Sequence, residues 1–419
     1  MTTQSNKQDL AALPYWRRAA KVIFWVFKKT WYTTISALTL LDAVLLLVSA
    51  YSDTISPTVW IVAPFLGLMF GVILLLSFLW LAFLMLTRRW MMTVVLLVAL
   101  LICSNRIWRY CPIHFSDPSP QTNVLTVNGK ETTTPVDTFR LMTFNTKALG
   151  DAKVARENAE IPIIDMVRDC KADVVCLQEY HFANKNKVNT ELSIRNRLLK
   201  EYPYYHFLLY SGRKDKDMGL AVYSKYPITH AEKVDTNTED YCWAAYYEIR
   251  VRGRKIGVIN CHLNTNSISD KNRKLYKEQA SHFQMDSLTH MREGMSQLAP
   301  SFRLRTHQSA TINKFIQKIN KKYEGRMPFI VCGDMNDTPI SFAYRTIRGN
   351  MSDTWVEAGS GLGISFRDAP FWFRIDHIFH NEQFRTLQVR LMRDVKDSDH
   401  YPVMATFQLL PEEDEEIEN

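Results

Sequence analysis

The sequence predicts a layered α/β sandwich of two sheets with flanking helices, preceded by an apolar region that would form about three transmembrane helices. Residues 34–105 are almost entirely apolar, whereas the roughly 300 residues that follow have the composition of a soluble domain. From residue 138 onward, short apolar strands alternate with helical patterns, and several strands are joined by short connections, which indicates antiparallel pairs. The length of 419 residues allows one large domain and a smaller region.

Three apolar runs precede the soluble domain, and each can form a spanning helix: residues 33–51, 59–86 and 90–105. The first run has about 18 mostly apolar residues, which is enough to cross a hydrocarbon core of roughly 30 Å at about 1.5 Å per residue. Asp42 lies in the middle of this run, where a carboxylate is costly unless it is paired; capping or bonding between helices is the ordinary explanation, and a functional role is the alternative. The sequence therefore predicts a multi-pass membrane protein that contacts the lipid bilayer through its N-terminal helices.

The basic residues around these runs predict their orientation. Residues 1–32 carry several bases, and Arg88 and Arg89 separate the second and third runs, so the positive-inside rule puts the N-terminus in the cytoplasm. Three crossings then put the large domain on the extracytoplasmic side of the membrane. Arg106 and Arg109 act against this inference, and failure of the third run to insert would put the domain in the cytoplasm.

The remaining boundaries follow from composition. We predict a basic cytoplasmic segment over residues 1–32, a transmembrane region over 33–110 and a linker rich in Pro, Ser and Thr over 111–137. The large α/β domain follows over residues 138–410, and an acidic tail over 411–419. The seven cysteines have irregular spacing and no CxxC pair, which argues against a disulfide framework and against a thiolate metal site. Two basic stretches, 211–219 and 271–277, could bind a phosphate backbone or lipid headgroups, or could be solvated loops.

The domain from residue 138 contains eight strand candidates: residues 139–145, 173–179, 219–224, 244–251, 255–263, 328–334, 373–380 and 403–410. Residues 157–172 have apolar positions at helical spacing, and residues 268–323 form a long polar helical stretch. Arg303, Arg305 and Gln308 on that stretch are expected to lie on a helix surface.

Many of these strands end in polar residues that metal and phosphate chemistry uses: Asn145, Glu179, His262, Asn264, Asp334, Asn336, Asp376, Asp399 and His400. One such residue would mean little, because Asp and Asn are favoured in any turn after a strand. The whole set is informative, because strand ends at one edge of a sandwich converge on a common surface. Asp337 we interpret as a turn residue only.

The residue types point to cleavage of phosphoesters. Oxygen ligands such as Asn145, Glu179 and Asp399 suit Mg²⁺ or Mn²⁺. His262 and His400 could contact phosphate oxygens or relay protons. Among the remaining candidates, Asp334 could deprotonate a water molecule and Asn336 could donate a hydrogen bond to a developing oxyanion.

The motifs "TFN", "LQE", "HLN", "GDMNDTP", "RIDHI" and "SDHYPV" occur in this order, and together they strongly resemble those of the endonuclease/exonuclease/phosphatase superfamily, which has the deoxyribonuclease-I-like fold. The resemblance covers residues 138–410. It implies a four-layered α/β sandwich that hydrolyses phosphoester bonds with a divalent metal, Mg²⁺ or Mn²⁺.

The resemblance also implies individual roles. Asn145, Glu179 and Asp399 become metal-site residues, with Glu179 the principal ligand, and His262 contacts the phosphate beside Asn264, whose role in substrate binding is less defined. Asp334 activates the attacking water, Asn336 stabilises the transition state, and Asp376 holds His400.

Departures from related families bear on the substrate. The sequence has "FRID" where inositol-polyphosphate phosphatases have "WCDR". Abasic-site endonucleases have tryptophan motifs near their later strands, and Trp355 and Trp372 are the residues that leave this alternative open. The whole pattern looks most like membrane-anchored bacterial members of the superfamily, which implies an inner-membrane location. Nucleic acid and phospholipid headgroups, the latter as in sphingomyelinase-like enzymes, both remain candidate substrates, and an inactive receptor or scaffold is a third alternative. No protein partner can be inferred.

Overall fold

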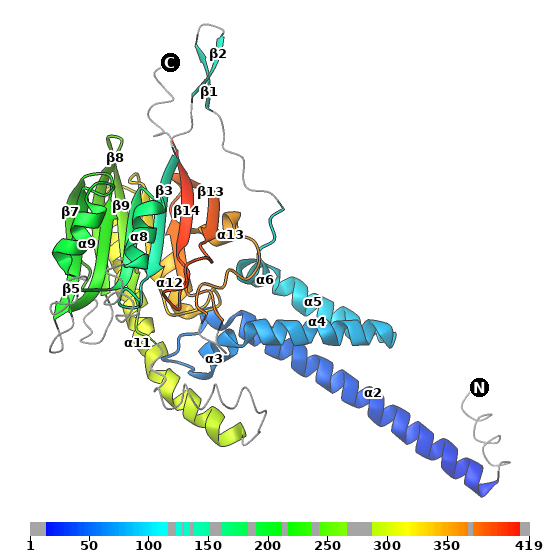
Figure 1. The fold of residues 1–419 in the computed structure, drawn as a ribbon. Helices are drawn as coiled ribbons and strands as arrows, with labels where there is room; N and C mark the ends of the chain where they lie inside the picture. Colours follow the sequence, from blue (N-terminus) through cyan, green and yellow to red (C-terminus); the bar gives the residue numbers. More distant parts are fainter. Residues whose placement is uncertain are drawn as a thin grey trace. The chain divides into compact units, whose positions relative to one another are not determined.

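The computed structural model describes residues 14–115, 123–127, 130–134, 138–150, 161–182, 190–211, 217–235, 243–265, 287–367 and 372–410 (Figure 1). The chain divides into two compact units. The first comprises Met1–Ala50 and Met69–Asn105, and the second comprises Tyr51–Leu68 and Arg106–Asn419.

The first unit consists of apolar helices: α2 (Tyr15–Ala50), α4 (Phe70–Leu86) and α5 (Trp90–Ile102). These helices pack against one another, and polar side chains join two of them. Ser77 Oγ donates to Asp42 Oδ1 over 2.9 Å, and Trp80 Nε1 donates to Thr39 Oγ1 over 3.0 Å. Of the explanations considered for Asp42, the structure shows a hydrogen bond between helices.

By length and composition, α2 is long and apolar enough to cross a membrane. Two bent pairs of helices also pass this test among the described residues: α3 (Val62–Leu68) with α4, and α5 with α6 (Ser104–Tyr110). The described chain therefore has one candidate span, or up to three if each bent pair counts as one.

The second unit is built on two six-stranded mixed sheets. Sheet I has the order β13-β14-β3-β4-β6-β5, and sheet II has the order β11-β12-β10-β9-β8-β7. The strands of sheet I are β3 (Thr138–Asn145), β4 (Val174–Phe182), β5 (Tyr204–Ser211), β6 (Asp217–Ser224), β13 (Phe384–Leu391) and β14 (Val403–Leu409). Those of sheet II are β7 (Ile228–Lys233), β8 (Trp243–Val251), β9 (Arg254–His262), β10 (Phe329–Asp334), β11 (Ser352–Asp353) and β12 (Asp376–His380). A separate hairpin, β1 (Asn123–Val127) and β2 (Lys130–Thr134), lies within the predicted linker.

Each sheet contains one parallel pair, β3 with β4 and β9 with β10, and its other pairs are antiparallel. Asp334, at the end of β10, lies in register with both His262 on β9 and Asp376 on β12. In sheet I, the end of β3 at Asn145 is in register with Gln178, the residue before Glu179. The parallel pairs therefore bring several predicted site residues to strand ends.

The two sheets pack face to face, and helices cover their outer faces, which gives the α/β sandwich expected from the sequence. The core between the sheets includes Leu141 and Cys176 from sheet I and Val258 and Cys332 from sheet II. On the outer face of sheet I lie α8 (Pro162–Asp169) and α9 (Glu191–Leu198). On the outer face of sheet II lie α11 (Ser287–Lys322) and α12 (Phe342–Arg348), while α13 (Thr354–Ala358) contributes to the core between the sheets.

The structure contains strands β5, β7 and β13, which the sequence analysis did not single out. None of the residues of β7 is fully buried, so its sequence shows no clear apolar alternation. β13 carries several charged or polar side chains, which hide its strand pattern in the same way. Some predictions fall on residues that the structure does not describe. These are residues 268–286 of the long helical stretch, which include the basic stretch 271–277, residues 212–216 of the first basic stretch, and the acidic tail 411–419.

Gly333 shows why the strand before the candidate site ends as it does. Its φ is +142°, and a Cβ atom there would lie 1.8 Å from the carbonyl oxygen of Cys261 on the neighbouring strand β9. A side chain would therefore collide with backbone rather than with a movable side chain. The close approach of β9 and β10 at this point brings His262 and Asp334 together.

Candidate active site

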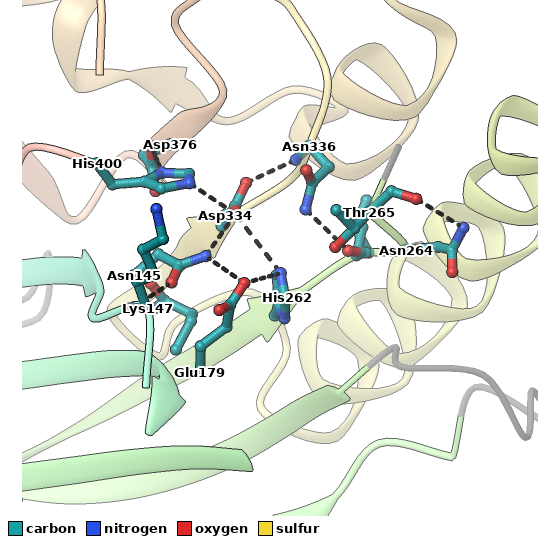
Figure 2. A network of polar contacts seen from close by, with 12 residues as sticks. Asn145, Lys147, Glu179, His262, Asn264, Thr265, Asp334, Asn336, Asp376 and His400 are labelled. Carbon is teal, nitrogen blue, oxygen red and sulfur yellow. Dashed lines mark hydrogen bonds and ion pairs between the residues drawn. The ribbon is translucent and has the colours of Figure 1, made fainter. Parts of the chain in front are cut away.

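Seven of the nine predicted site residues meet around one buried carboxylate, Asp334 (Figure 2). Its Oδ2 accepts a hydrogen bond from Asn145 Nδ2 over 2.9 Å, and its Oδ1 accepts one from the backbone N–H of Asn336 over 2.8 Å. The Nε2 atoms of His262 and His400 lie 3.5 Å and 3.7 Å from Asp334 Oδ2. The two sheets thus contribute to a single polar cluster, since Asn145 ends a strand of sheet I and His262 and Asp334 end strands of sheet II.

Asp376 holds His400. Its Oδ2 lies 2.8 Å from Nδ1 of the imidazole, and both side chains are nearly inaccessible to solvent. Burial alone would lower the pKa of His400, but the carboxylates of Asp376 and Asp334 outweigh it and raise this pKa to about 10. His400 is therefore an imidazolium at neutral pH, with Nε2 directed toward Asp334 (Figure 2).

Burial raises the pKa of Asp334, while the neighbouring His400 and His262 act in the opposite direction. A carboxyl group of this kind has a proton affinity suited to a general base. Asn145 connects it to a second carboxylate, because Nδ2 also donates to Glu179 Oε1 over 3.1 Å. His262 Nε2 lies 3.7 Å from the same Glu179 oxygen.

Glu179 occupies a strained backbone position. Its φ is +48°, at an irregularity in the pairing of β4 with β6 between Leu177 and Tyr180. The loop after β3 holds this conformation: Thr146 Oγ1 and the N–H of Ala148 both donate to the carbonyl oxygen of Glu179, over 3.1 Å and 3.0 Å. Strain that the surrounding structure imposes in this way is typical of functional residues.

Asn336 and Asn264 follow the ends of neighbouring strands but differ in position. Asn336 has φ +50° and donates from Nδ2 to the carbonyl oxygen of Leu263 over 3.0 Å, which leaves its second N–H for another acceptor. Asn264 donates from Nδ2 to Thr265 O over 3.2 Å and is directed away from Asp334 (Figure 2). The structure therefore does not bring Asn264 into the cluster.

Asp399 forms an ion pair that the sequence analysis did not anticipate. Its Oδ2 lies 2.8 Å from Nζ of Lys147, two residues after Asn145. Burial would raise the pKa of Asp399, but His400 and Lys147 hold it below its usual range. A basic residue two positions after a strand-end asparagine was the available signal, but a lysine in a loop is too common to single out.

A buried amide pair beneath the cluster joins the two sheets. Gln178 Nε2 donates to Asn260 Oδ1 over 2.7 Å, and Asn260 Nδ2 donates to the carbonyl oxygen of Leu177 over 3.1 Å. Both side chains are fully buried, so the hydrogen bonds between them fix the distance between sheet I and sheet II next to Glu179. Neither residue was predicted as part of the site.

The expected surface position was wrong for Arg305 and for Gln308, which is fully buried and accepts a hydrogen bond at Oε1 from the N–H of Asn264 over 3.0 Å. Arg305 makes the more extensive contacts. Its side chain is fully buried on α11, where Nε donates to Asp337 Oδ2 over 3.2 Å and Nη1 donates to the carbonyl oxygen of Asn264 over 2.9 Å. Asp337 follows the strand in a bend, as predicted, but is also buried, and burial raises its pKa although Arg305 counteracts this. Arg305 therefore joins the chain segments after β9 and β10.

The donor set fits a hard divalent cation. One atom each of Asp334, Asp376 and His400 lies within 4.8 Å of the other two, and because His400 is protonated the carboxylates are the ligands that this group provides. Asp376 Oδ1 is a buried oxygen without a hydrogen-bond partner among the described residues. Carboxylate oxygens dominate the cluster once Glu179 is included, and none of the six described cysteines is part of it.

The family model described as "Endonuclease/Exonuclease/phosphatase family" matches residues 142–400, and one described as "Domain of unknown function (DUF8431)" matches residues 37–110. The chain matches none of the curated proteins with which it was compared.

Solved structures with a similar fold include an endonuclease/exonuclease/phosphatase from Beutenbergia cavernae DSM 12333, with 15% identity, a TM-score of 0.45 and coverage of 66% of this chain and 72% of that one. Truncated Caenorhabditis elegans TDP2 has 16% identity, a TM-score of 0.44 and coverage of 65% and 97%. The human Nocturnin catalytic domain with bound sulfate has 14% identity, a TM-score of 0.45 and coverage of 65% and 93%.

The family model spans all the residues that meet around Asp334, from Asn145 to His400, and covers more than half of the chain. The chain belongs to the endonuclease/exonuclease/phosphatase family and is a phosphoester hydrolase.

Proposed function

We propose that this protein is a membrane-anchored, divalent-metal-dependent phosphodiesterase that uses Asp334 to activate water. The observation that carries the proposal is the convergence on Asp334, at the end of β10, of Asn145, His262 and His400, from three other strands or strand connections. One buried carboxylate surrounded by an amide and two imidazoles is suited to deprotonating water beside a bound phosphate.

Each side chain has a role that its contacts support. Asp334 accepts the proton of the attacking water, so that a new phosphorus–oxygen bond forms as the bond to the leaving group breaks. His400, held by Asp376, and His262 donate to the phosphate oxygens, where negative charge accumulates. Asn336 donates its second N–H in the same way.

Glu179 and Asn145, with Asp399, would hold Mg²⁺ or Mn²⁺. When bound, such an ion supplies Lewis acidity toward the phosphoryl group. Lys147 competes for Asp399 in the described structure, so metal binding would require this ion pair to loosen or Asp399 to bind through its other oxygen.

The full chain in detergent should hydrolyse bis-p-nitrophenyl phosphate when Mg²⁺ or Mn²⁺ is present. Because the proposed chemistry needs the cation, EDTA should reduce the release of p-nitrophenol to background, and excess Mg²⁺ or Mn²⁺ should restore it. The absorbance of p-nitrophenolate measures the rate directly. Turnover that continues unchanged in EDTA would contradict metal dependence.

The apolar helices of the first unit support anchoring in a membrane, which we propose to be the bacterial inner membrane. We place the second unit, which contains the site around Asp334 and is called the catalytic unit below, outside the cytoplasm. The basic residues before α2 and at Arg88 and Arg89 support this orientation. Accessibility of an engineered cysteine in the catalytic unit to a membrane-impermeant thiol reagent in intact cells tests it.

A hollow beside the cluster supports an anionic substrate that extends beyond the scissile phosphate. The cavity has a volume of about 540 Å³ and is lined by the cations Lys147, Arg367 and Lys396, together with Asp397 and Asp399. A second phosphate group of a nucleic acid backbone would fit this environment.

A lipid headgroup is the second candidate, because large apolar side chains of the second unit are exposed to solvent. They include Trp108, Ile113, Phe115, Leu362 and Trp372. His114 joins two of the segments concerned, since its ring contacts Trp108 at 5.3 Å and its Nδ1 lies 2.8 Å from the carbonyl oxygen of Gly359. Tryptophan at such a surface is typical of contact with a membrane interface.

Replacing Trp372 with Ser separates the two candidate substrates. If the substrate is a phospholipid, the variant should lose activity on phospholipid vesicles by about tenfold, which is about 1.4 kcal/mol of lost interfacial binding, but keep its activity on bis-p-nitrophenyl phosphate. If nucleic acid is the substrate, an oligonucleotide should be cleaved equally by both proteins, with strong inhibition by salt. Product release from each substrate is measured in parallel.

An inactive receptor or scaffold would not need to keep the whole set of side chains. The cluster around Asp334 retains a carboxylate, an amide and two imidazoles in mutual contact, which supports an enzyme.

A further inference from the structure

The catalytic unit includes chain segments that the sequence analysis assigned to the membrane region. Residues 51–68 and 106–115, which we call the collar, belong to the same compact unit as the sheets. The collar contains the short helix η1 (Ser52–Thr54), α3 and most of α6. Two residues of the predicted linker also pack here, because the N–H of Gly361 donates to Pro112 O over 2.8 Å and His114 contacts Gly359.

A buried ion pair organises the collar. The side chain of Asp53 is completely inaccessible to solvent, and its Oδ2 lies 2.7 Å from Nη1 of Arg109, while Oδ1 lies 3.7 Å from Nη2 of Arg106. Removing a carboxylate from water is costly, so this arrangement requires both guanidinium groups to stay in place. The pair therefore fixes η1 and α6 relative to each other.

The collar contacts the catalytic loop, residues 334–340, which begins at the proposed base. Ser52 Oγ donates to the carbonyl oxygen of Ile340 over 3.0 Å, and Arg109 Nη1 lies 3.5 Å from the carbonyl oxygen of Pro339. Gly67 allows this close packing, because a Cβ atom at this position would lie 2.2 Å from Ser52 Oγ and 2.7 Å from Ile340 O. One end of the loop is thus held by β10 and the other by the collar.

Arg109 of the collar also contacts the segment that carries Asp376. Arg374, which is buried, donates from Nη2 to the carbonyl oxygen of Arg109. The next residue, Ile375, accepts a hydrogen bond at its carbonyl oxygen from the N–H of Met335 over 2.9 Å. Arg109 therefore contacts both segments whose side chains meet in the site.

A third connection passes through α11. The ring of Phe65 packs edge-on against Phe302 with centroids 5.1 Å apart, and the guanidinium of Arg305 lies over the ring of Phe302, 4.8 Å from its centroid. Arg305 in turn holds Asp337 and the carbonyl oxygen of Asn264. The collar is therefore packed against the residue that joins the two polar loops.

We propose that the collar is a positioning element of the active site: Ser52, Gly67 and the Asp53–Arg109 pair hold the catalytic loop so that Asp334 and Asn336 face the substrate. The kinetic part of this proposal rests on the proposed phosphoesterase function. The conformational part does not, because it concerns the order of residues 334–340 whether or not a substrate is known.

The test uses the full chain in detergent with the single substitutions Ser52→Ala and Gly67→Ala. We expect kcat for bis-p-nitrophenyl phosphate to fall about tenfold in the first and about a hundredfold in the second, with KM changed less than about twofold, because small displacements of reacting groups affect turnover rather than binding. The matched control is Ser224→Ala. Ser224 is also buried, and its hydroxyl donates to a backbone carbonyl, that of Tyr226, over 2.8 Å, but it lies at the opposite end of sheet I.

Hydrogen–deuterium exchange of peptides covering residues 334–341 provides the second measurement. Exchange should increase in both collar variants, including at temperatures well below their unfolding transitions, and should not change in Ser224→Ala. Equal kcat values and equal exchange in collar and control variants would overturn the proposal. If the unsubstituted chain has no activity, the phosphoesterase proposal fails, and exchange alone decides the role of the collar.

Discussion

Replacing Asp334 with Asn should lower kcat by about 10³ to 10⁴-fold, because the amide cannot accept the proton of the attacking water. The substitution preserves the volume of the side chain, and its single amide oxygen can still accept one of the two hydrogen bonds that Asp334 accepts from Asn145 Nδ2 and the N–H of Asn336. The fold should therefore remain, and circular dichroism should be unchanged. The rate of hydrolysis of bis-p-nitrophenyl phosphate at saturating Mg²⁺ measures the effect.

Asp173→Asn is the control for this experiment. Asp173 is also a largely buried aspartate whose carboxylate accepts a backbone hydrogen bond, from the N–H of Arg140 over 2.8 Å. It precedes β4 at the end of the sheet opposite to the site, so the control should retain turnover within about twofold. Retention of more than a tenth of the original kcat in Asp334→Asn would show that another group activates the water.

The second large effect is expected for Asp376→Asn, which should reduce kcat by about 10² to 10⁴-fold. The carboxylate 2.8 Å from Nδ1 of His400 fixes the orientation of the ring and stabilises its charged form. An asparagine in the same position cannot compensate that charge, so a buried neutral imidazole would face the phosphate.

Because Asp376 acts through His400, the two substitutions should not be additive. The double variant Asp376→Asn/His400→Gln should have nearly the same kcat as His400→Gln alone, which kinetic comparison of the four proteins measures. Additive losses would mean that Asp376 contributes separately, for instance as a direct ligand through its unpartnered Oδ1.

Much of the fold could be predicted because its central strands have clear apolar patterns in the sequence. β3, β10 and β14 are buried apolar runs bounded by polar residues, and each was expected within a few residues of its observed limits. Family membership, predicted from six ordered motifs, is confirmed by the match over residues 142–400. The strand-end positions of these motifs also explain why Asn145, His262 and Asp334 meet.

The missed features depend on contacts between residues distant in the sequence. Arg305 has helical spacing and a charge, which predict a surface position, and only the buried Asp337 explains why the guanidinium lies inside. In the same way, Gln178 and Asn260 are separated by 82 positions and acquire meaning only when the sheets pack. Local patterns cannot identify such pairs, because each partner alone looks like an ordinary polar residue.

The separation of membrane and soluble regions at residue 110 followed from hydropathy alone. Residues 59–68 continue an apolar run, so a helix through position 86 was the natural expectation, yet α3 ends at Leu68 and belongs with the sheets. Gly67 and Ser52 are part of the catalytic unit because they fit against Ile340.

This division has a consequence for proteolysis. A protease that cuts between residues 115 and 138 would leave the collar on the N-terminal fragment and the sheets on the other. The contacts of Ser52 and Arg109 with the catalytic loop would then be intermolecular, and they would be lost on dilution because their effective concentration is no longer set by the chain. If the collar positions the catalytic loop as we propose, such a cut would therefore lower the activity of the fragment that carries the sheets.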